Sequence, residues 1–316
     1  MMRGALLAIA SALAFGATAP LIGRFGAHLG AWTVAALLYI GAAAAMLPGW
    51  RTRPVPKSDL RRIAITGVLG AMLAPAALAW GIAHTGALSA SLVLALEAIF
   101  TVVIAALVFH EHVGRRVAAA ALLIATGAMV LVAAGGNSAV GALGIAAVAI
   151  ATLLWAIDNA ITGTIVAADP SAVVVLKSAT GIAGALLFAL LSHEALPDAF
   201  SAVALIAAGA IGFGASLRWY VLAQRTFGVA RTASLFSIAP FAGSAIAYAF
   251  GERATAGPLF ALATGLIAAG VALHLGERHD HPHRHGSLVH SHPHAPDAEH
   301  RHAHDGGKAL GTRKPS

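Results

Sequence analysis

Two segments of the chain, residues 87–134 and 229–275, carry the same pattern. The positions that correspond are Ala90-Ser91-Leu92 with Ala233-Ser234-Leu235, Glu97 with Pro240, Ile124-Ala125-x-Gly127 with Ile267-Ala268-x-Gly270, and, after a two-residue slip, Glu111 with Glu252. The chain between the two segments holds an odd number of expected membrane spans, so the second copy enters the membrane from the opposite side. Such an inverted repeat is typical of secondary transporters, which bind their solutes near the middle of the membrane.

The low content of charged residues excludes most soluble folds. Of the 316 residues, 59% are hydrophobic and 10% are charged, whereas soluble domains contain roughly 25% charged residues. Ten spans of roughly 20 residues use about 200 residues, which leaves short loops and one tail but no sizeable soluble domain. Cysteine is absent, so thiolate chemistry and cysteine metal sites are excluded.

The apolar segments and the turn residues between them predict the fold. We expect an all-α integral membrane protein with ten transmembrane helices in two inverted five-helix repeats, followed by a disordered cytoplasmic tail. The expected spans are 4–22, 29–47, 63–83, 87–109, 117–134, 140–164, 171–191, 199–222, 229–250 and 257–275. The two repeats would cover residues 1–137 and 138–276, and the histidine-rich tail residues 277–316.

The basic residues of the loops predict the orientation. On one side we expect Arg3, Arg51, Arg53, Lys57, Arg61, Arg62, Arg115, Arg116, Arg225, Arg231 and the tail. The other side carries only Arg24 and Arg253 among the loop arginines and lysines. Loops rich in Lys and Arg stay in the cytoplasm, so we expect a multi-pass protein of the cell inner (plasma) membrane with both termini cytoplasmic. The same loops explain the net charge of +7, and nucleic acid is therefore not an expected partner.

Charged side chains at membrane depth are candidates for a solute or ion pathway, because a charge in hydrocarbon is costly and usually faces a cavity or a partner. Glu97 would lie about 15 Å into the fourth span, near the midplane. It could carry a coupling proton, contact a cationic group, or serve only as a structural carboxyl. Asp158 and Lys177 would lie at similar depths on neighbouring helices and form an ion pair. That pair would be a static link or part of a gate or solute contact.

Further pathway candidates surround these residues. Asn159 adjoins the expected pair, and Arg218 on the eighth span lies at a somewhat shallower depth. Pro75 and Pro240 fall near the middle of the third and ninth spans. A proline removes an intrahelical hydrogen bond and frees a carbonyl group. Such breaks often line the substrate path of transporters, although simple kinks would explain both prolines.

Several motifs resemble one transporter family. They are Leu96-Glu97-Ala98-Ile99-Phe100, Phe109-His110-Glu111, Trp155-Ala156-Ile157-Asp158-Asn159, and Pro240 with Phe250-Gly251-Glu252. They resemble the end of one EamA repeat and the start and end of a second. The resemblance covers residues 1–275 and implies the drug/metabolite transporter superfamily, with ten helices, two inverted halves, and export or exchange of small metabolites. Asp158 and Lys177 depart from the commoner uncharged residues, so a generic amino-acid exporter is not implied.

After Leu275 the composition changes abruptly. Three groups of histidines with i, i+2 spacing contain His279, His281, His283, His285, His290, His292, His294, His300, His302 and His304. This spacing does not align side chains on one helix face, and the prolines among them favour disorder. Neutral imidazole binds zinc, nickel and related ions. We therefore expect a flexible tail that binds Zn, Ni or Co, the alternative being a solvated tail that only buffers near neutral pH.

Together these features predict a secondary transporter of a small solute, which works by alternating access in the lipid bilayer and is coupled to an ion. One version moves a divalent metal (Ni, Co or Zn) that the tail gathers or senses, and another exports a small organic metabolite with a regulatory tail. A membrane-tethered metal store or sensor without transport is the third hypothesis. No cofactor is required, and the oligomeric state stays open, a homodimer included.

An enzyme is not expected. His110-Glu111-His112 lacks the HExxH spacing of a metalloprotease helix, and the chain has no glycine-rich loop for a nucleotide.

Overall fold

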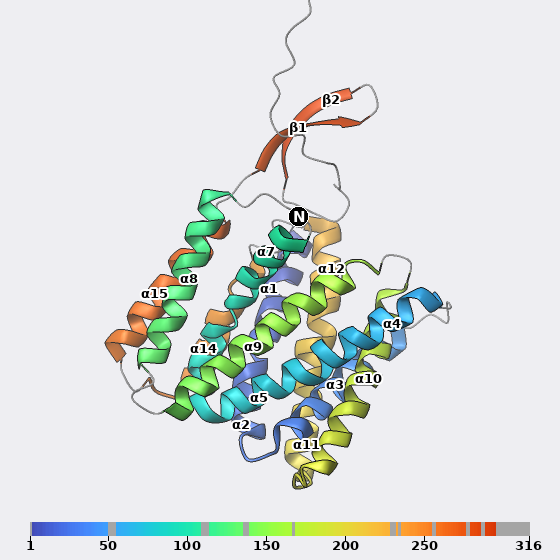
Figure 1. Ribbon diagram of the computed structural model, residues 1–316, viewed down its shortest axis with the longest axis vertical. Helices are drawn as coiled ribbons and strands as arrows, with labels where there is room; N and C mark the ends of the chain where they lie inside the picture. The colour runs from blue at the N-terminus through green and yellow to red at the C-terminus, as the bar shows by residue number, and fades with distance from the viewer. Residues whose placement is uncertain are drawn as a thin grey trace, which may run out of the picture. The chain divides into compact units, whose positions relative to one another are not determined.

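The computed structural model describes residues 2–49, 55–108, 114–134, 139–165, 168–227, 232, 235–254, 257–275, 279–285 and 288–294. The chain divides into two units, Met1–Glu277 and Arg278–Ser316. Every described element of the first unit is a helix (Figure 1).

Eight helical segments among the described residues are long and apolar enough to cross a membrane. They are Met2–Gly26, Ala31–Gly49, Lys57–Thr85, Ala87–Val108, Arg115–Ala134, Val140–Thr162, Ser171–Leu191 and Ala199–Tyr220. Each overlaps one of the first eight expected spans. The ninth and tenth expected spans contain shorter described helices. The unit is thus a multi-pass, all-helical membrane protein.

Turn residues separate the helices of residues 1–137. These helices are α1 (Met2–Gly16), α2 (Thr18–Gly26), α3 (Ala31–Met46), η1 (Leu47–Gly49), α4 (Lys57–Thr66), η2 (Gly67–Leu73), α5 (Ala74–Thr85), α6 (Ala87–Val93), α7 (Leu96–Val108) and α8 (Arg115–Ala134). Gly86 joins α5 to α6 with a φ of 79°, a conformation that glycine adopts without steric cost. This turn allows the third and fourth spans to be joined by one residue.

Residues 138–276 form a second series of helices. They are α9 (Ala139–Thr162), α10 (Pro170–Leu191), α11 (Ala199–Gly209), η3 (Ala210–Ala215), α12 (Ser216–Phe227), α14 (Ala239–Ala249) and α15 (Gly257–Leu275). Asp169 caps α10 by accepting a hydrogen bond from the backbone N–H of Ser171 at 2.8 Å, and Pro170 suits the first helical position. The widened π-type turns η2 and η3 interrupt the third and eighth spans.

Small residues let the helices approach closely. A Cβ atom on Gly41 of α3 would overlap the carbonyl oxygen of Ile206, and a Cβ atom on Gly209 would overlap that of Leu38. Apolar burial alone gives helices little attraction in lipid, so association depends on such close backbone contact. The glycines therefore fix the packing of α3 against α11.

The contact between α8 and α15 is reciprocal. A Cβ atom on Gly127 of α8 would lie 2.6 Å from Cγ1 of Ile267, and one on Gly270 of α15 would lie 2.6 Å from Cγ1 of Ile124. These residues are the ones that the sequence pattern pairs, Ile124 with Ile267 and Gly127 with Gly270. Corresponding positions of the two halves therefore meet each other.

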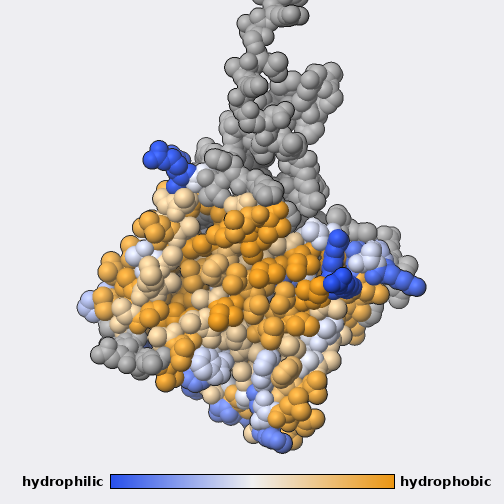
Figure 2. Space-filling model, in the orientation of Figure 1, coloured by the Kyte–Doolittle hydropathy of each residue, from blue (hydrophilic) through white to orange (hydrophobic). Residues whose placement is uncertain are grey.

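Hydrophobic side chains cover the outside of this unit. Figure 2 shows a broad hydrophobic band over α5 and α9, with hydrophilic residues toward its edges. Leu107, Leu122 and Leu143 are among the exposed large hydrophobic residues. A soluble protein rarely exposes so extensive an apolar surface, whereas lipid tails solvate it.

The second unit contains a hairpin that the sequence analysis does not predict. β1 (His279–His285) and β2 (Leu288–His294) pair as an antiparallel hairpin. The i, i+2 spacing of the histidines matches the period of a β-strand, in which alternate residues share a face. Disorder of the tail as a whole stays a prediction. His300, His302 and His304 lie outside the described residues.

Candidate solute pathway

An interruption of the fourth span determines the position of Glu97. α6 ends at Val93, and α7 begins at Leu96 after two turn residues. Glu97 therefore lies in the first turn of α7, where the helix dipole favours a negative charge. The sequence predicts the depth of Glu97 but gives no sign of this interruption.

Glu97 is joined to α9 by a hydrogen bond between the two halves of the chain. Nδ2 of Asn159 donates to Oε1 of Glu97 at 3.0 Å. The side-chain amide is neutral, so this bond orients the carboxyl group but does not neutralise a charge on it. Glu97 is half-buried, and α7 packs along α9.

Asp158 and Lys177 form the ion pair that the sequence predicts. Nζ of Lys177 donates to Oδ2 of Asp158, and the two side chains are 13% and 3% exposed, respectively. The hydroxyl group of Thr162 donates to Oδ1 of Asp158 at 3.1 Å. Both carboxylate oxygens thus have partners. Removing either charge would leave the other buried without a counterion.

These contacts define a central polar group, which consists of Glu97, Asp158, Asn159, Thr162 and Lys177. It contains two carboxyl groups and one ammonium group, and only one of the carboxyl groups is in an ion pair. Among the described residues no group of three or more His, Cys, Asp or Glu side chains could hold a metal ion.

The widened turn η2 supports Asp158. The carbonyl oxygen of Gly70 accepts hydrogen bonds from the hydroxyl group of Tyr39 at 2.6 Å and from Nε1 of Trp155 at 3.0 Å. A Cβ atom on Gly70 would overlap the carboxylate of Asp158. Only glycine therefore lets Asp158 approach this backbone. The sequence reasoning did not identify Tyr39 or Gly70, because neither is charged nor part of a recognised motif.

Aromatic rings adjoin the central polar group through Tyr39 and Trp155. An aromatic cluster of Phe15, Tyr39, Trp155, Phe213 and Phe236 has ring-centroid separations of 5.4–6.3 Å. The rings come from both halves of the chain. Aromatic faces attract organic cations, and apolar walls with few polar groups are typical of small-molecule sites. In the sequence these aromatic residues lie in the middle of expected spans, whereas interfacial aromatic residues lie at span ends. That difference in position is the sequence signal for the cluster.

The remaining predicted pathway residues lie elsewhere. Arg218 on α12 is exposed, and within the described part of the chain no hydrogen bond or ion pair joins it to the central polar group. Pro75 is the second residue of α5, which directly follows η2, and Pro240 is the second residue of α14, which directly follows a turn at residues 237–238. Proline suits a first helical turn, so both residues mark helix starts after an interruption.

The interruptions of the fourth and ninth spans correspond. In the register that pairs Glu97 with Pro240, the turn at residues 94–95 falls on the turn at residues 237–238.

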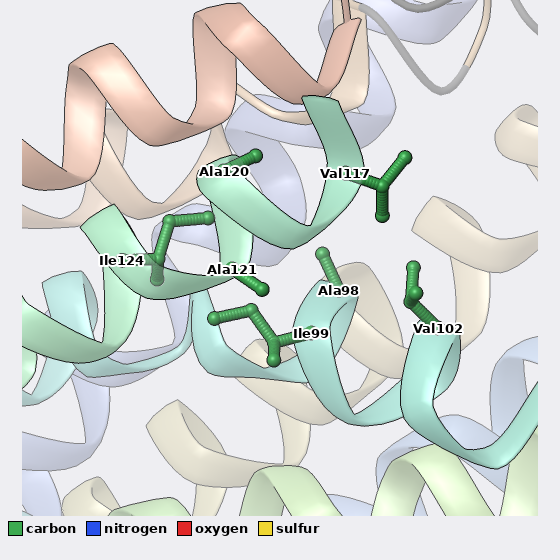
Figure 3. Close-up of a pocket in the computed structure, with 7 residues that line it drawn as sticks. All are labelled: Ala98, Ile99, Val102, Val117, Ala120, Ala121 and Ile124. Carbon is green, nitrogen blue, oxygen red and sulfur yellow. The ribbon is translucent and has the colours of Figure 1, made fainter. Parts of the chain in front are cut away.

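A small pocket between α7 and α8 is separate from the central polar group. Its lining consists of Ala98, Ile99, Val102, Val117, Ala120, Ala121 and Ile124 (Figure 3). All of these side chains are apolar, so the pocket has no group that could select a polar solute.

At the opposite end of the bundle from Met2, the loop residue Asp198 caps α11. Hydrogen bonds from the hydroxyl group and the backbone N–H of Ser201 lower the pKa of Asp198 from 3.8 to about 2, and His28 contributes a weaker hydrogen bond. This carboxylate is therefore ionised at all physiological pH values.

Comparison with known proteins agrees with this architecture. Residues 2–133 match the EamA-like transporter family, and no curated protein matches the chain. Fifteen chains of solved structures match. One, described as "Crystal structure of protein", is 21% identical, covers 86% of this chain and 96% of its own, and has a TM-score of 0.60, which indicates a shared fold. Residues 2–133 are thus similar to the EamA-like transporter family, whose members are membrane transporters of small solutes.

Proposed function

We propose that the protein is a ten-helix secondary transporter in which residues 1–137 and 138–276 are inverted repeats. Three observations support this relation. Gly127 and Gly270 make reciprocal contacts between α8 and α15. The fourth and ninth spans are interrupted at corresponding positions. The third and eighth spans contain the widened turns η2 and η3. Discontinuous helices at the interface between repeats are typical of alternating-access transporters.

The basic residues support a location in the cell inner membrane with both termini cytoplasmic. Arg3, Lys57 and Arg115 lie at the end of the helical unit where α1 begins and α15 ends, whereas Arg24 and Arg253 lie at the opposite end. An excess of Lys and Arg marks the cytoplasmic side.

The observation that carries the solute proposal is the uncompensated carboxyl group of Glu97 beside a buried ion pair. Glu97 contacts a neutral amide, whereas the Asp158 carboxylate is already paired with Lys177. We therefore propose a small organic solute with a positively charged group, exchanged at Glu97 for a coupling proton. The aromatic cluster supports this choice because it offers ring faces to a cation. Intramembrane carboxyl groups serve as proton relays in many transporters.

Uptake into proteoliposomes tests this proposal. Organic amines, amino acids, and Zn²⁺, Ni²⁺ and Co²⁺ would be compared under an imposed pH gradient. Glu97→Gln keeps the size of the side chain but removes proton exchange, so we expect amine flux to be lost or to become independent of the gradient. The matched control is Thr101→Val, one helical turn along α7, where the exposed hydroxyl group only donates to the Glu97 carbonyl oxygen. Normal pH-dependent flux through Glu97→Gln would remove Glu97 from the mechanism.

A second role, metal binding by the tail, is favoured by the register of the hairpin. His279 pairs with His294, His281 with His292, and His283 with His290. Directly opposed residues of an antiparallel pair have Cα atoms roughly 4.5–5.5 Å apart. Two adjacent pairs would supply four imidazole groups, which matches the tetrahedral preference of zinc. We propose that this face gathers a divalent metal, such as Zn, Ni or Co, and adjusts transport.

An exchange of neighbouring residues tests the role of the register without changing the composition. Combining Asp280→His with His281→Asp, and Ser291→His with His292→Ser, removes the middle pair. We expect Zn²⁺ affinity in calorimetric titrations to fall roughly tenfold or more. Unchanged affinity would mean that a flexible chain wraps the ion.

Deleting residues 278–316 distinguishes a transporter from a metal store. A transporter keeps its flux without the tail, whereas a metal store loses its whole phenotype.

A further inference from the structure

Glu252 caps a helix of the other half of the chain. It follows α14, where the backbone N–H of Glu252 donates to the Ala247 carbonyl oxygen at 3.1 Å and Gly251 has a φ of 101°. Its Oε2 accepts from the backbone N–H of Leu88 at 2.8 Å, and its Oε1 accepts from that of Ala87 at 3.2 Å. The carboxylate thus satisfies N–H groups that the first turn of α6 would otherwise leave without partners.

Glu194 makes the same arrangement at α3. It follows α10, where the N–H of Glu194 donates to the Ala189 carbonyl oxygen at 2.9 Å and His193 has a φ of 52°. Its Oε2 accepts from the backbone N–H of Thr33 at 2.8 Å and from the Thr33 hydroxyl group at 2.7 Å, and Oε1 accepts from the N–H of Trp32 at 3.2 Å. Each glutamate therefore links a helix of residues 138–276 to the start of a helix of residues 1–137.

Glycine precedes both capped helices. Gly86 and Gly30 occupy the cap positions of α6 and α3 and have no side chain that could cap the helix. A Cβ atom on Gly86 would lie 2.9 Å from Oε2 of Glu252, and one on Gly30 would overlap the Glu194 carboxyl group. The two glutamates therefore replace the side-chain caps that local sequence usually supplies.

The two capped helices differ in how far they can move. α3 is a continuous helix of 16 residues that packs against α10, α11 and η3. α6 has only seven residues and ends at the interruption of the fourth span. Beyond that interruption, α7 packs mainly against α9, whereas α6 packs mainly against α14 and makes smaller contacts with α2, α5, α9 and α8. α6 can therefore swing about residues 94–95 while α7 stays in place, but α3 has no comparable hinge.

We propose that Glu252 is a latch, which holds α6 against α14 and closes the end of the solute pathway opposite the start of α1, and that Glu194 is a permanent anchor. This inference rests on the proposed transport function. Opening that end requires the two backbone N–H groups of α6 to leave the Glu252 carboxylate, whereas the bonds of Glu194 persist through the transport cycle. Glu252 thereby acts as a positioning residue for the moving segment.

Thiol labelling tests the latch. The chain contains no cysteine, so Ser91→Cys on α6 introduces a single thiol. Ser91 is 1% exposed, and a Cβ atom on Gly243 of α14 would lie 3.0 Å from its Cβ atom. Glu252→Ala removes two hydrogen bonds to a charged group, and such bonds stabilise the closed position of α6 more than bonds between neutral groups do. We therefore expect maleimide to label the thiol at position 91 roughly tenfold to a hundredfold faster in the Glu252→Ala protein. Glu194→Ala should leave that rate unchanged.

Two comparisons separate a latch from a general loosening of the fold. Ser11→Cys places the thiol at a buried contact between α1 and α12, where Glu252→Ala should not change labelling. Glu252→Gln keeps one acceptor oxygen, so it should accelerate labelling at position 91 by a smaller factor. Equal acceleration by Glu194→Ala, acceleration at both thiols, or no effect of either Glu252 variant would overturn the proposal. Labelling needs no transported solute, so a failure of the flux assays would refute transport separately.

Discussion

Replacing Asp158 by asparagine should be more harmful than replacing Asp158 and Lys177 together. Asp158→Asn keeps the size of the side chain, and its amide oxygen can still accept from Thr162. It leaves the Lys177 ammonium group, which is 13% exposed in the native pair, without an anion. Adding Lys177→Met removes that stranded charge and keeps an unbranched chain of similar length. The comparison therefore isolates the pair from the loss of either residue alone.

The size of the effect follows from the burial of the pair. Removing one partner of a buried ion pair costs about 3–5 kcal/mol, whereas an apolar replacement of the whole pair is often nearly neutral. Each 1.4 kcal/mol is about a tenfold change in an equilibrium constant, so Asp158→Asn should shift the folding equilibrium by roughly a hundredfold to several thousandfold. The double variant should recover most of this loss.

Unfolding in mixed micelles, followed by tryptophan fluorescence, measures the free energies of the four proteins in this double-mutant cycle. A coupling free energy of on the order of 2–4 kcal/mol is expected between the two sites. If the losses of the two single variants simply add in the double variant, the ion pair contributes nothing and the reasoning from burial is wrong. Asn159→Ala, next to Asp158 but outside the pair, is the control that should show no such coupling to Lys177→Met.

Two further predictions concern packing and pH. Gly209→Ala should lower the free energy of unfolding by about 1–3 kcal/mol, because the added Cβ atom overlaps the Leu38 carbonyl oxygen; Gly265→Ala, where a Cβ atom meets nothing within 4 Å, should be neutral or stabilising. The pKa of Asp198, lowered to about 2 from 3.8 by Ser201, predicts stability that is fully present above about pH 4 and is lost as the pH falls toward 2. Thermal unfolding midpoints test both, and Asp198→Ala should reduce the decline between about pH 4 and pH 2.

The sequence predicts the spans well because lipid imposes one strong rule. A segment in hydrocarbon must satisfy its backbone hydrogen bonds internally, so apolar length and turn residues are enough to locate a helix. The eight described spans overlap the expected ones for this reason. The ion pair of Asp158 and Lys177 was predictable on the same ground, since two opposite charges at equal depth in neighbouring helices have few other partners.

Other features of the pathway depend on contacts that no local pattern contains. The carbonyl oxygen of Gly70 becomes a shared acceptor only because Tyr39 and Trp155 converge on it from two other helices. The caps made by Glu194 and Glu252 join residues more than 160 positions apart. Both glutamates lie between expected spans, where an acidic residue has no required partner. The hairpin was missed for another reason, because only one of the two relevant periodicities was considered.

The latch and the central polar group hold the two parts of one interrupted span. Glu252 holds α6, and Asn159 holds α7 through Glu97. Asp158, the neighbour of Asn159 on α9, is bound instead to α10 through Lys177. A cationic solute that binds the carboxyl group of Glu97 must compete with the Asn159 amide for it. Binding of the solute thereby loosens α7 from α9, while α9 stays attached to α10. The contacts of α7 and of α6 then become alternatives, because releasing both would leave mainly apolar packing and the hydrogen bond from the Ser244 hydroxyl group to the Leu88 carbonyl oxygen between this span and residues 138–276. We therefore predict that solute bound at Glu97 slows labelling at position 91, since a span freed at α7 depends on the Glu252 contact.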